Sequence, residues 1–187
     1  IKVLAGIYHP EEGEVFLDGV KTVFRTPFES QQKGISVVHQ EFKMSESLSV
    51  AENMFLGNLL YKGRLVDWKA MRVQADRMLR DLGVPLDVDT PVERLSVAQK
   101  QMVEICKAVN RNCKVLIMDE PSATLTEKEQ ALMFGTVRKL KADGVTVIYI
   151  SHRLEEIFDL CDTVTVLRDG AHIATKPVSE VTRDELV

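Results

Sequence analysis

The chain has 187 residues, of which 45% are hydrophobic and 28% are charged, as in an ordinary globular protein. This length suffices for one domain with a substantial core and a small inserted subdomain. A formal net charge of -4 argues against nucleic acid as the main partner. The 3 cysteines show no C-x-x-C spacing, which argues against a disulfide framework or a zinc site. No apolar run approaches the roughly 18 residues of a membrane-spanning helix.

Hairpin signals and short apolar runs indicate the strands. Asp-Gly pairs at 18–19 and 169–170 each separate two β-type runs, which is a strong hairpin signal. Residues 35–38 and 145–150 are runs of strand length that are rich in β-branched and other apolar residues. These patterns predict an α/β fold in which buried parallel strands are accompanied by antiparallel hairpins.

Helix-start signals divide the rest of the chain. Ser or Thr followed three residues later by Glu or Gln forms a capping box, and this pattern begins at Ser49, Ser96 and Thr126. Asp67 is the expected cap of a longer helix. Because residues 41–95 show helical patterns and no convincing strand, we expect a helical insertion between two strands. The helix after Thr126 is expected to bury a face formed by Leu132, Met133, Val137 and Leu140.

The stretch over residues 114–121 carries the most informative chemistry. An apolar run is followed at once by Asp119 and Glu120, and Pro121 prevents the strand from continuing. Folds of the α/β class bind ligands at the carboxyl ends of their strands. Two adjacent carboxylates there suit phosphoryl transfer, with one for Mg²⁺ and one for the attacking water. A solvated acidic turn is the alternative interpretation, and this stretch alone does not separate the two.

Polar residues also follow two other predicted strands. Gln40 comes after the strand over residues 35–38, and His152 comes after the strand over residues 145–150. Gln40 alone could be a surface loop residue, and a single histidine after a strand is more often structural than catalytic. If the strands share one parallel sheet, these residues and the two carboxylates face the same crevice.

The order and wording of these segments resemble the ATPase cassette of ABC transporters over essentially the whole chain. Gln40 stands where that family has its Q-loop, and His152 stands where it has its H-loop. Residues 95–99 resemble the signature motif, residues 115–120 resemble the Walker B strand, and residues 122–126 resemble the D-loop.

Details narrow the resemblance and also depart from it. Residues 150–157 and 165–170 resemble the branch that imports ribose, galactose or xylose, whose ATPase subunit carries two fused cassettes, and the chain resembles part of the first. Val97 and Ala98 replace the two glycines of the signature motif, and an added Cβ narrows the approach to a phosphate. The Gly-x-x-x-x-Gly-Lys-Ser/Thr loop that cradles phosphates does not occur in the sequence. Residues 1–6 look like the end of the helix that follows this loop, so we expect a chain cut just after it.

The resemblance implies a P-loop NTPase-like parallel sheet core with an antiparallel β part and an inserted α-helical subdomain. The expected domains are an N-terminally incomplete ATPase core, formed by residues 1–40 and 96–187, and a helical subdomain formed by residues 41–95.

The resemblance also implies the residues of the site. Asp119 would hold Mg²⁺ through its water shell, Glu120 would polarise the attacking water, and His152 would contact the γ-phosphate of ATP. Gln40 would reach the metal or the water. The further nucleotide-binding residues that it implies are Ser96, Ala98, Gln99 and Ala123. Ser96 and Gln99 would serve the nucleotide of an opposing cassette, although Ser96 could equally be a plain helix cap.

The implied function is ATP binding and hydrolysis that powers sugar import, at the cytoplasmic face of the cell membrane. The implied partners are the transporter's membrane subunits, a second cassette and, indirectly, a sugar-binding protein outside the membrane. Two alternatives remain: a cassette outside any transporter, ribosome-associated or regulatory, and a structural cassette that does not hydrolyse ATP. No long charged linker supports the former, and Glu120 with His152 argues against the latter.

Overall fold

A three-stranded parallel sheet lies at the centre of the computed structural model, which describes residues 1–38 and 44–186. Its order is β3 (Ile35–Val38), β6 (Val115–Asp119) and β7 (Thr146–Ile150), with β6 in the middle. The expected α/β fold with a parallel core is therefore confirmed.

The remaining elements surround this sheet. The helices are α1 (Pro27–Gln32), α2 (Val50–Phe55), α3 (Trp68–Leu82), α4 (Val97–Val109), α5 (Glu127–Ala142) and α6 (Leu154–Leu160), with short 3₁₀ turns at Val92–Arg94, Val178–Glu180 and Arg183–Glu185. The further strands are β1 (Val15–Leu17), β2 (Val20–Thr22), β4 (Tyr61–Lys62), β5 (Leu65–Val66), β8 (Thr163–Arg168) and β9 (Ala171–Pro177). They pair as three antiparallel hairpins, β1–β2, β4–β5 and β8–β9.

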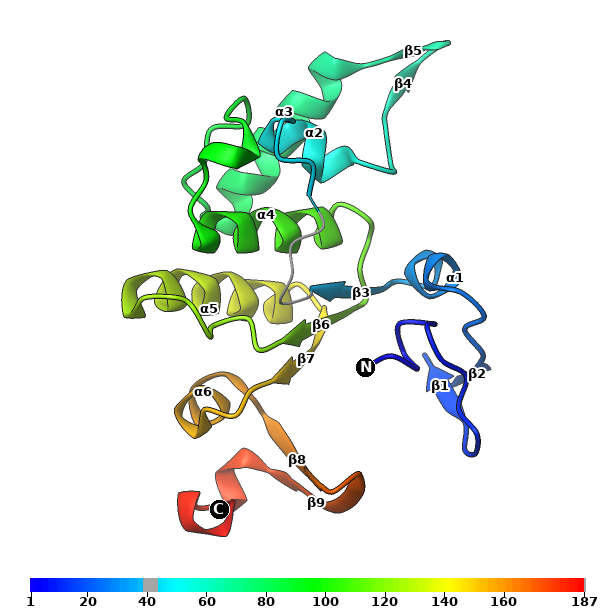
Figure 1. Ribbon diagram of the computed structural model, residues 1–187, viewed down its shortest axis with the longest axis vertical. Helices are drawn as coiled ribbons and strands as arrows, with labels where there is room; N and C mark the ends of the chain where they lie inside the picture. The colour runs from blue at the N-terminus through cyan, green and yellow to red at the C-terminus, as the bar shows by residue number, and fades with distance from the viewer. Residues whose placement is uncertain (39–43, 187) are drawn as a thin grey trace.

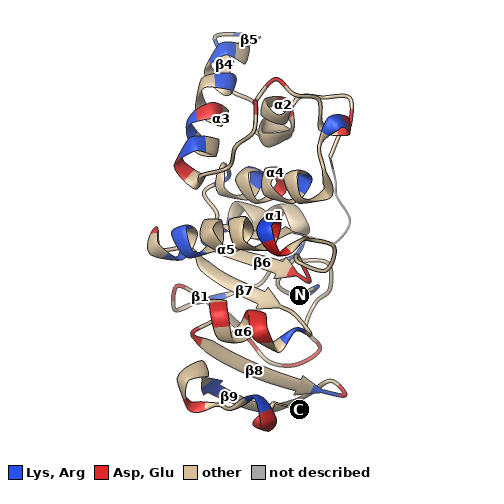
Figure 2. Cartoon of the chain, turned by 90° about the vertical axis from the view of Figure 1, so that its left-hand side faces the viewer, with Lys and Arg blue, Asp and Glu red and all other residues tan. Residues whose placement is uncertain are grey.

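Figure 1 shows the layers that these elements form. Helices α2, α3 and α4 lie on one side of the sheet, and the hairpin β8–β9 lies beyond α6 on the other. In Figure 2, basic and acidic residues are mixed along α3 and α4, and α6 carries acidic residues, so this view shows no continuous basic face. No helix among the described residues is long and apolar enough to cross a membrane.

Strand β6 is buried on both faces, as its apolar run predicts. Leu116 and Met118 point into the main core, which also contains residues of α2, α3, α4 and α5. Ile117 points the opposite way and packs with Phe24 and Ile35 in a second, smaller cluster. This alternation follows from the two-residue period of a strand.

The helices begin where their capping patterns predict. Ser49, Ser96 and Thr126 each accept a hydrogen bond from the third helical amide, and in each case the Glu or Gln side chain at that position reaches back. Asp67 caps α3, which ends at Gly83 in the left-handed conformation with φ +72°. These caps satisfy amides that the helix cannot pair internally.

Gly6 ends the opening segment as expected. The Gly6 amide donates to the Val3 carbonyl at 3.0 Å and the Ile7 amide donates to the Lys2 carbonyl at 2.9 Å, which is the Schellman pattern of a helix end. Gly6 has φ +70°, and a Cβ there would lie 2.4 Å from the carbonyl oxygen of Thr26. Glycine is therefore required at this position for two reasons: the positive φ angle, and the close approach of Thr26, the residue that caps α1.

Two expectations were wrong. The helical region contains a strand pair, Tyr61–Lys62 with Leu65–Val66, and two-residue strands are too short to show an alternating pattern. Leu132 is 37% exposed, whereas its neighbour Met133 is fully buried. Consecutive helical residues point about 100° apart. The buried face of α5 therefore includes Met133 and excludes Leu132.

Shortening the buried side chain of Leu116 in β6 should therefore reduce stability far more than shortening the exposed side chain of Leu132 in α5. We expect Leu116→Ala to lower the free energy of unfolding by about 3 kcal/mol, because it leaves a cavity in a fully packed core. Leu132→Ala, the matched control, should cost less than about 1 kcal/mol. Urea denaturation measures both values, and equal losses would contradict the core assignment.

The capping box of α2 makes stability depend on pH. The Ser49 hydroxyl donates to the Glu52 carboxylate at 2.7 Å and the Ser49 amide donates at 2.8 Å, and these bonds lower the pKa of Glu52 below its usual 4.5. A carboxyl group with a lowered folded pKa adds stability above its unfolded pKa. It loses that contribution as the pH falls through the folded pKa.

We expect the free energy of unfolding of the wild type to fall more steeply than that of Glu52→Gln between about pH 5 and pH 3. Glu12→Gln, in the exposed loop before β1, is the control and should keep the wild-type slope. Chemical denaturation at several pH values gives the slopes. Identical slopes for the wild type and Glu52→Gln would show that this cap does not couple to pH.

Candidate functional site

The pairing of β6 with β7 places the predicted site residues at neighbouring strand ends. Asp119, the last residue of β6, is paired with Ile150, the last residue of β7. The Glu120 amide then donates to the Ile150 carbonyl at 2.9 Å, so the pairing continues one residue beyond β6. This bond holds Glu120 beside the segment that leads to His152.

Glu120 and His152 meet across this edge of the sheet. The Glu120 Oε1 atom lies 3.3 Å from the His152 Nδ1 atom, and their side chains are 39% and 69% exposed. Such an exposed pair contributes only about 0–1 kcal/mol to stability. The contact therefore adds little stability, but it shows that a carboxylate and an imidazole lie side by side where both can reach a ligand.

The backbone of Glu120 is strained. Its φ of +47° lies in the left-handed region, which costs an L-residue other than glycine about 1–2 kcal/mol. The turn continues with a bond from the Ala123 amide to the Glu120 carbonyl at 3.4 Å, and the intervening Pro121 and Ser122 are buried. Strain of this kind persists only where surrounding structure imposes it, and it gathers at functional sites.

Asp119 ends β6 with a carboxylate, which is the type of oxygen ligand that Mg²⁺ takes. Within the described part of the chain its carboxylate makes no hydrogen bond or ion pair, and its residue is partly exposed. The described residues contain no group of three or more His, Cys, Asp or Glu side chains that could hold a metal by themselves. A donor set of one carboxylate fits Mg²⁺, which takes most of its ligands from water and substrate phosphates.

The start of α4 holds the other predicted nucleotide contacts. The Ser96 hydroxyl accepts from the Gln99 amide at 3.2 Å, and the Gln99 side-chain oxygen accepts from the Ser96 amide at 2.9 Å. Val97 is 48% exposed, whereas Ala98 is buried. The Ala98 side chain thus packs inward, which leaves its backbone amide as the group that an anion at this helix end could meet.

Two predicted nucleotide contacts remain, Ala123 and Gln40. Ala123 is exposed in the turn after Glu120. Gln40 lies outside the described residues, so its predicted role is neither supported nor contradicted by the geometry.

Sequence reasoning missed a buried carboxylate close to this site. Glu156 in α6 is 1% exposed and accepts hydrogen bonds from Ser122 and Ser151. A signal was present, because Glu156 lies four residues before the buried Leu160, and residues with this spacing share one face of a helix.

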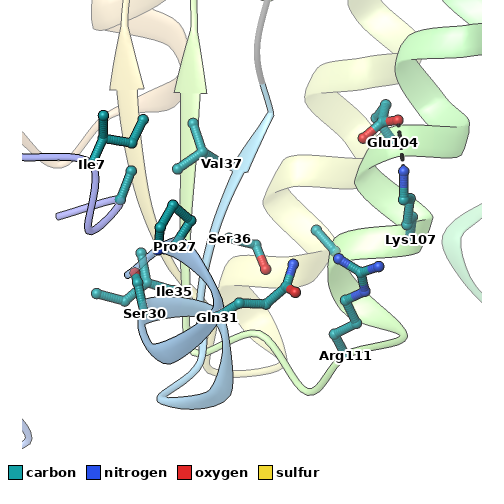
Figure 3. Close-up of a pocket in the computed structure, with 12 residues that line it drawn as sticks. Ile7, Pro27, Ser30, Gln31, Ile35, Ser36, Val37, Glu104, Lys107 and Arg111 are labelled. Carbon is teal, nitrogen blue, oxygen red and sulfur yellow. Dashed lines mark hydrogen bonds and ion pairs between the residues drawn. The ribbon is translucent and has the colours of Figure 1, made fainter. Parts of the chain in front are cut away.

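Two hollows formed by described residues have neither Glu120 nor His152 on their walls. One of about 220 Å³ lies between α1, β3 and α4, and the ion pair of Glu104 with Lys107, at 3.1 Å, is on its wall (Figure 3). A larger one of about 900 Å³ follows β7 and the start of β8. The predicted site is thus an open strand edge rather than the wall of either hollow.

Comparison with known proteins decides the family. A family model described as ABC transporter matches residues 1–123. The chain belongs to the ABC transporter family. The ATPase-cassette resemblance of the sequence is therefore confirmed.

Curated relatives match the whole chain. A putative ribose/galactose/methyl galactoside import ATP-binding protein of Agrobacterium fabrum is 46% identical over 187 residues, which are 100% of this chain and 37% of that protein. The ribose import ATP-binding protein RbsA of Caldanaerobacter subterraneus is 44% identical over 188 residues, which are 100% of this chain and 38% of that protein. The chain thus spans well under half the length of these relatives.

Solved structures support the same fold. A nucleotide-free ATP-binding cassette from an ABC transporter superposes with a TM-score of 0.81 at 26% identity, covering 94% of this chain and 74% of that one. The ADP conformation of MJ1267, an ATP-binding cassette of an ABC transporter, gives a TM-score of 0.81 at 27% identity, covering 99% and 75%.

The strained backbone at Glu120 can be tested by the order of two substitutions. We expect Glu120→Gly to be more stable than Glu120→Ala by about 1 kcal/mol, because only glycine adopts the left-handed region freely. At Lys139, inside α5, the order should reverse by roughly 0.5–1 kcal/mol. Thermal or urea unfolding of the four variants gives both differences. If alanine is the more stable at both positions, the left-handed turn is wrong.

Proposed function

We propose that the chain is the ATP-binding and ATP-hydrolysing part of an ABC transporter that imports sugar. The observation that carries this proposal is the 3.3 Å contact between Glu120 and His152 at the ends of neighbouring parallel strands, in a member of the ABC transporter family. The sugar is suggested by relatives that carry ribose import in their names and match the chain over its full length.

The proposed chemistry divides between three side chains. Glu120, partly open to solvent, orients and polarises the water that attacks the γ-phosphate. His152 turns Nδ1 toward Glu120, which leaves Nε2 as the ring nitrogen for a γ-phosphate oxygen. Asp119 holds Mg²⁺ through water, and the bound ion would neutralise charge on the phosphates. Gln40 reaches the same metal or water.

A second cassette completes each nucleotide site in this proposal. The exposed Ser96 with Gln99 and the Ala98 amide form the start of a 13-residue helix, whose positive end suits a phosphate held by the opposite cassette. Ala123, exposed in the turn after the acidic pair, would lie at the seam between the cassettes. Closure around two ATP molecules then depends on both ligand and partner.

The proposed domains and partners rest on the resemblance of the sequence to an ABC cassette. Residues 1–40 and 96–187 form the ATPase core, and residues 41–95 form the helical subdomain that contacts the transporter's membrane subunits. A sugar-binding protein outside the membrane delivers the sugar to those subunits. The chain would act on the cytoplasmic face, as a peripheral part of the complex.

The test is Glu120→Gln in the full-length protein assembled with its transporter partners. We expect ATP turnover to fall at least about 100-fold, because the amide cannot polarise the water as a carboxylate does. The Kd for Mg-ATP should change less than about threefold, since binding does not need that charge. Glu127→Gln, at the exposed start of α5, is the control and should keep wild-type turnover. Normal turnover in Glu120→Gln would overturn the assignment of the base.

A further inference from the structure

A single buried carboxylate in α6 collects an unusual number of donors. Glu156 is 1% exposed, and its side chain is fully buried. Its Oε1 atom accepts from Ser122 Oγ at 2.6 Å and Gln130 Nε2 at 3.1 Å and lies 2.9 Å from Arg153 Nη1, while its Oε2 atom accepts from Tyr149 OH and Ser151 Oγ, each at 2.8 Å. Burying a carboxylate is costly unless donors replace its water, and here both oxygens are satisfied.

These donors belong to the segments that hold the proposed site. Ser122 lies two residues after Glu120, and Ser151 immediately precedes His152. The Ser151 hydroxyl also accepts from the Arg153 amide at 3.0 Å, which closes a turn around His152. One carboxylate therefore ties down both sides of His152 and the segment after Glu120.

The site itself supplies little to hold His152 in place. Among the described residues its ring has one polar partner, Glu120, and both side chains are well exposed. An exposed pair of this kind does not fix a geometry by itself. The position of His152 relative to Glu120 must therefore come from the backbone on either side, which is the part that Glu156 holds.

Glu156 also makes contacts that concern packing alone. Gln130 comes from α5, and Tyr149 lies in β7 with its ring edge-on to Phe134 at 6.1 Å between ring centres. Burial and the contact with Glu156 raise the pKa of Tyr149 above its usual range, so this hydroxyl remains a donor at every working pH. A purely structural role would lower stability when Glu156 is changed and leave the chemistry of the folded protein intact.

We propose that Glu156 is a positioning residue for ATP hydrolysis, which binds the segments of Ser122 and Ser151 so that Glu120 and His152 meet at the strand edge. The inference rests on the proposed function of the site. The Glu156 side chain is fully buried, and it acts through the two serines.

The test is Glu156→Gln in the full-length protein assembled with its partners, beside Glu155→Gln. Glu155 is the adjacent residue but is exposed, with its side chain 3.4 Å from Arg183. Glutamine keeps the volume of the Glu156 side chain. Its NH₂ group is a donor, however, and it would face neighbouring groups that also donate. We expect kcat to fall at least about tenfold with the KM for ATP within about twofold, because misplaced catalytic groups slow the chemical step. Glu155→Gln should match the wild type in both parameters.

Ser151→Ala is measured in parallel, since it keeps the buried carboxylate and removes one tie. We expect its kcat to fall about threefold at unchanged KM, and Glu156→Gln to lose little more when Ser151→Ala is added, because both act through one network. Wild-type kcat in a folded Glu156→Gln protein would overturn the proposal, and so would wild-type kcat in Ser151→Ala if Glu156→Gln fails to fold. A wild type without ATP turnover would instead overturn the proposed function.

Discussion

The parallel pairing of β6 between β3 and β7 is the constraint on which the rest of the structure depends. Its register pairs Met118 with Val38 on one side and Asp119 with Ile150 on the other, so all three strands end at one edge. Leu116 and Ile117 are fully buried on opposite faces. A slip by one residue would exchange those faces, and the packed core forbids it. The position of the acidic strand end is thus set by apolar packing.

A rigid sheet allows two costly features to persist beside it. Glu120 has a left-handed backbone, and Glu156 is an acidic side chain buried away from solvent. A left-handed backbone at a residue such as Glu120 costs of the order of 1–3 kcal/mol. A buried acidic side chain such as Glu156 persists only when hydrogen-bond donors surround it. Both lie where β6 and β7 pass into their loops. The packing of the core therefore offsets the cost of these two features, which lie at the edge of the sheet where the chemistry is proposed.

The sequence predicts local features well and non-local ones poorly. The caps at Ser96 and Thr126 were found because a capping box is a pattern of four consecutive residues. Leu132 was misplaced because it borders the apolar stripe, and the β4–β5 hairpin is too short for any period. The sequence does not predict the left-handed backbone of Glu120, because that turn depends on pairing with β7. The sequence does not reveal the network around Glu156, because two of its partners, Ser122 and Gln130, lie 34 and 26 residues away along the chain. The pattern at the end of the acidic strand suggested the division of Asp119 and Glu120 between metal and water, whereas the roles of Gln40, Ser96 and His152 came from family resemblance.

The left-handed turn at Glu120 narrows the evolutionary options at that position. The backbone favours glycine or asparagine, whereas the proposed chemistry needs a carboxylate. Aspartate alone meets both demands, but its side chain is one methylene shorter and would withdraw from His152. A change of residue 120 to glycine or asparagine therefore eases the backbone but removes the carboxylate that the proposed chemistry needs. A cassette that has lost selection for hydrolysis should reveal itself by a relaxed residue here, while its core strand remains unchanged.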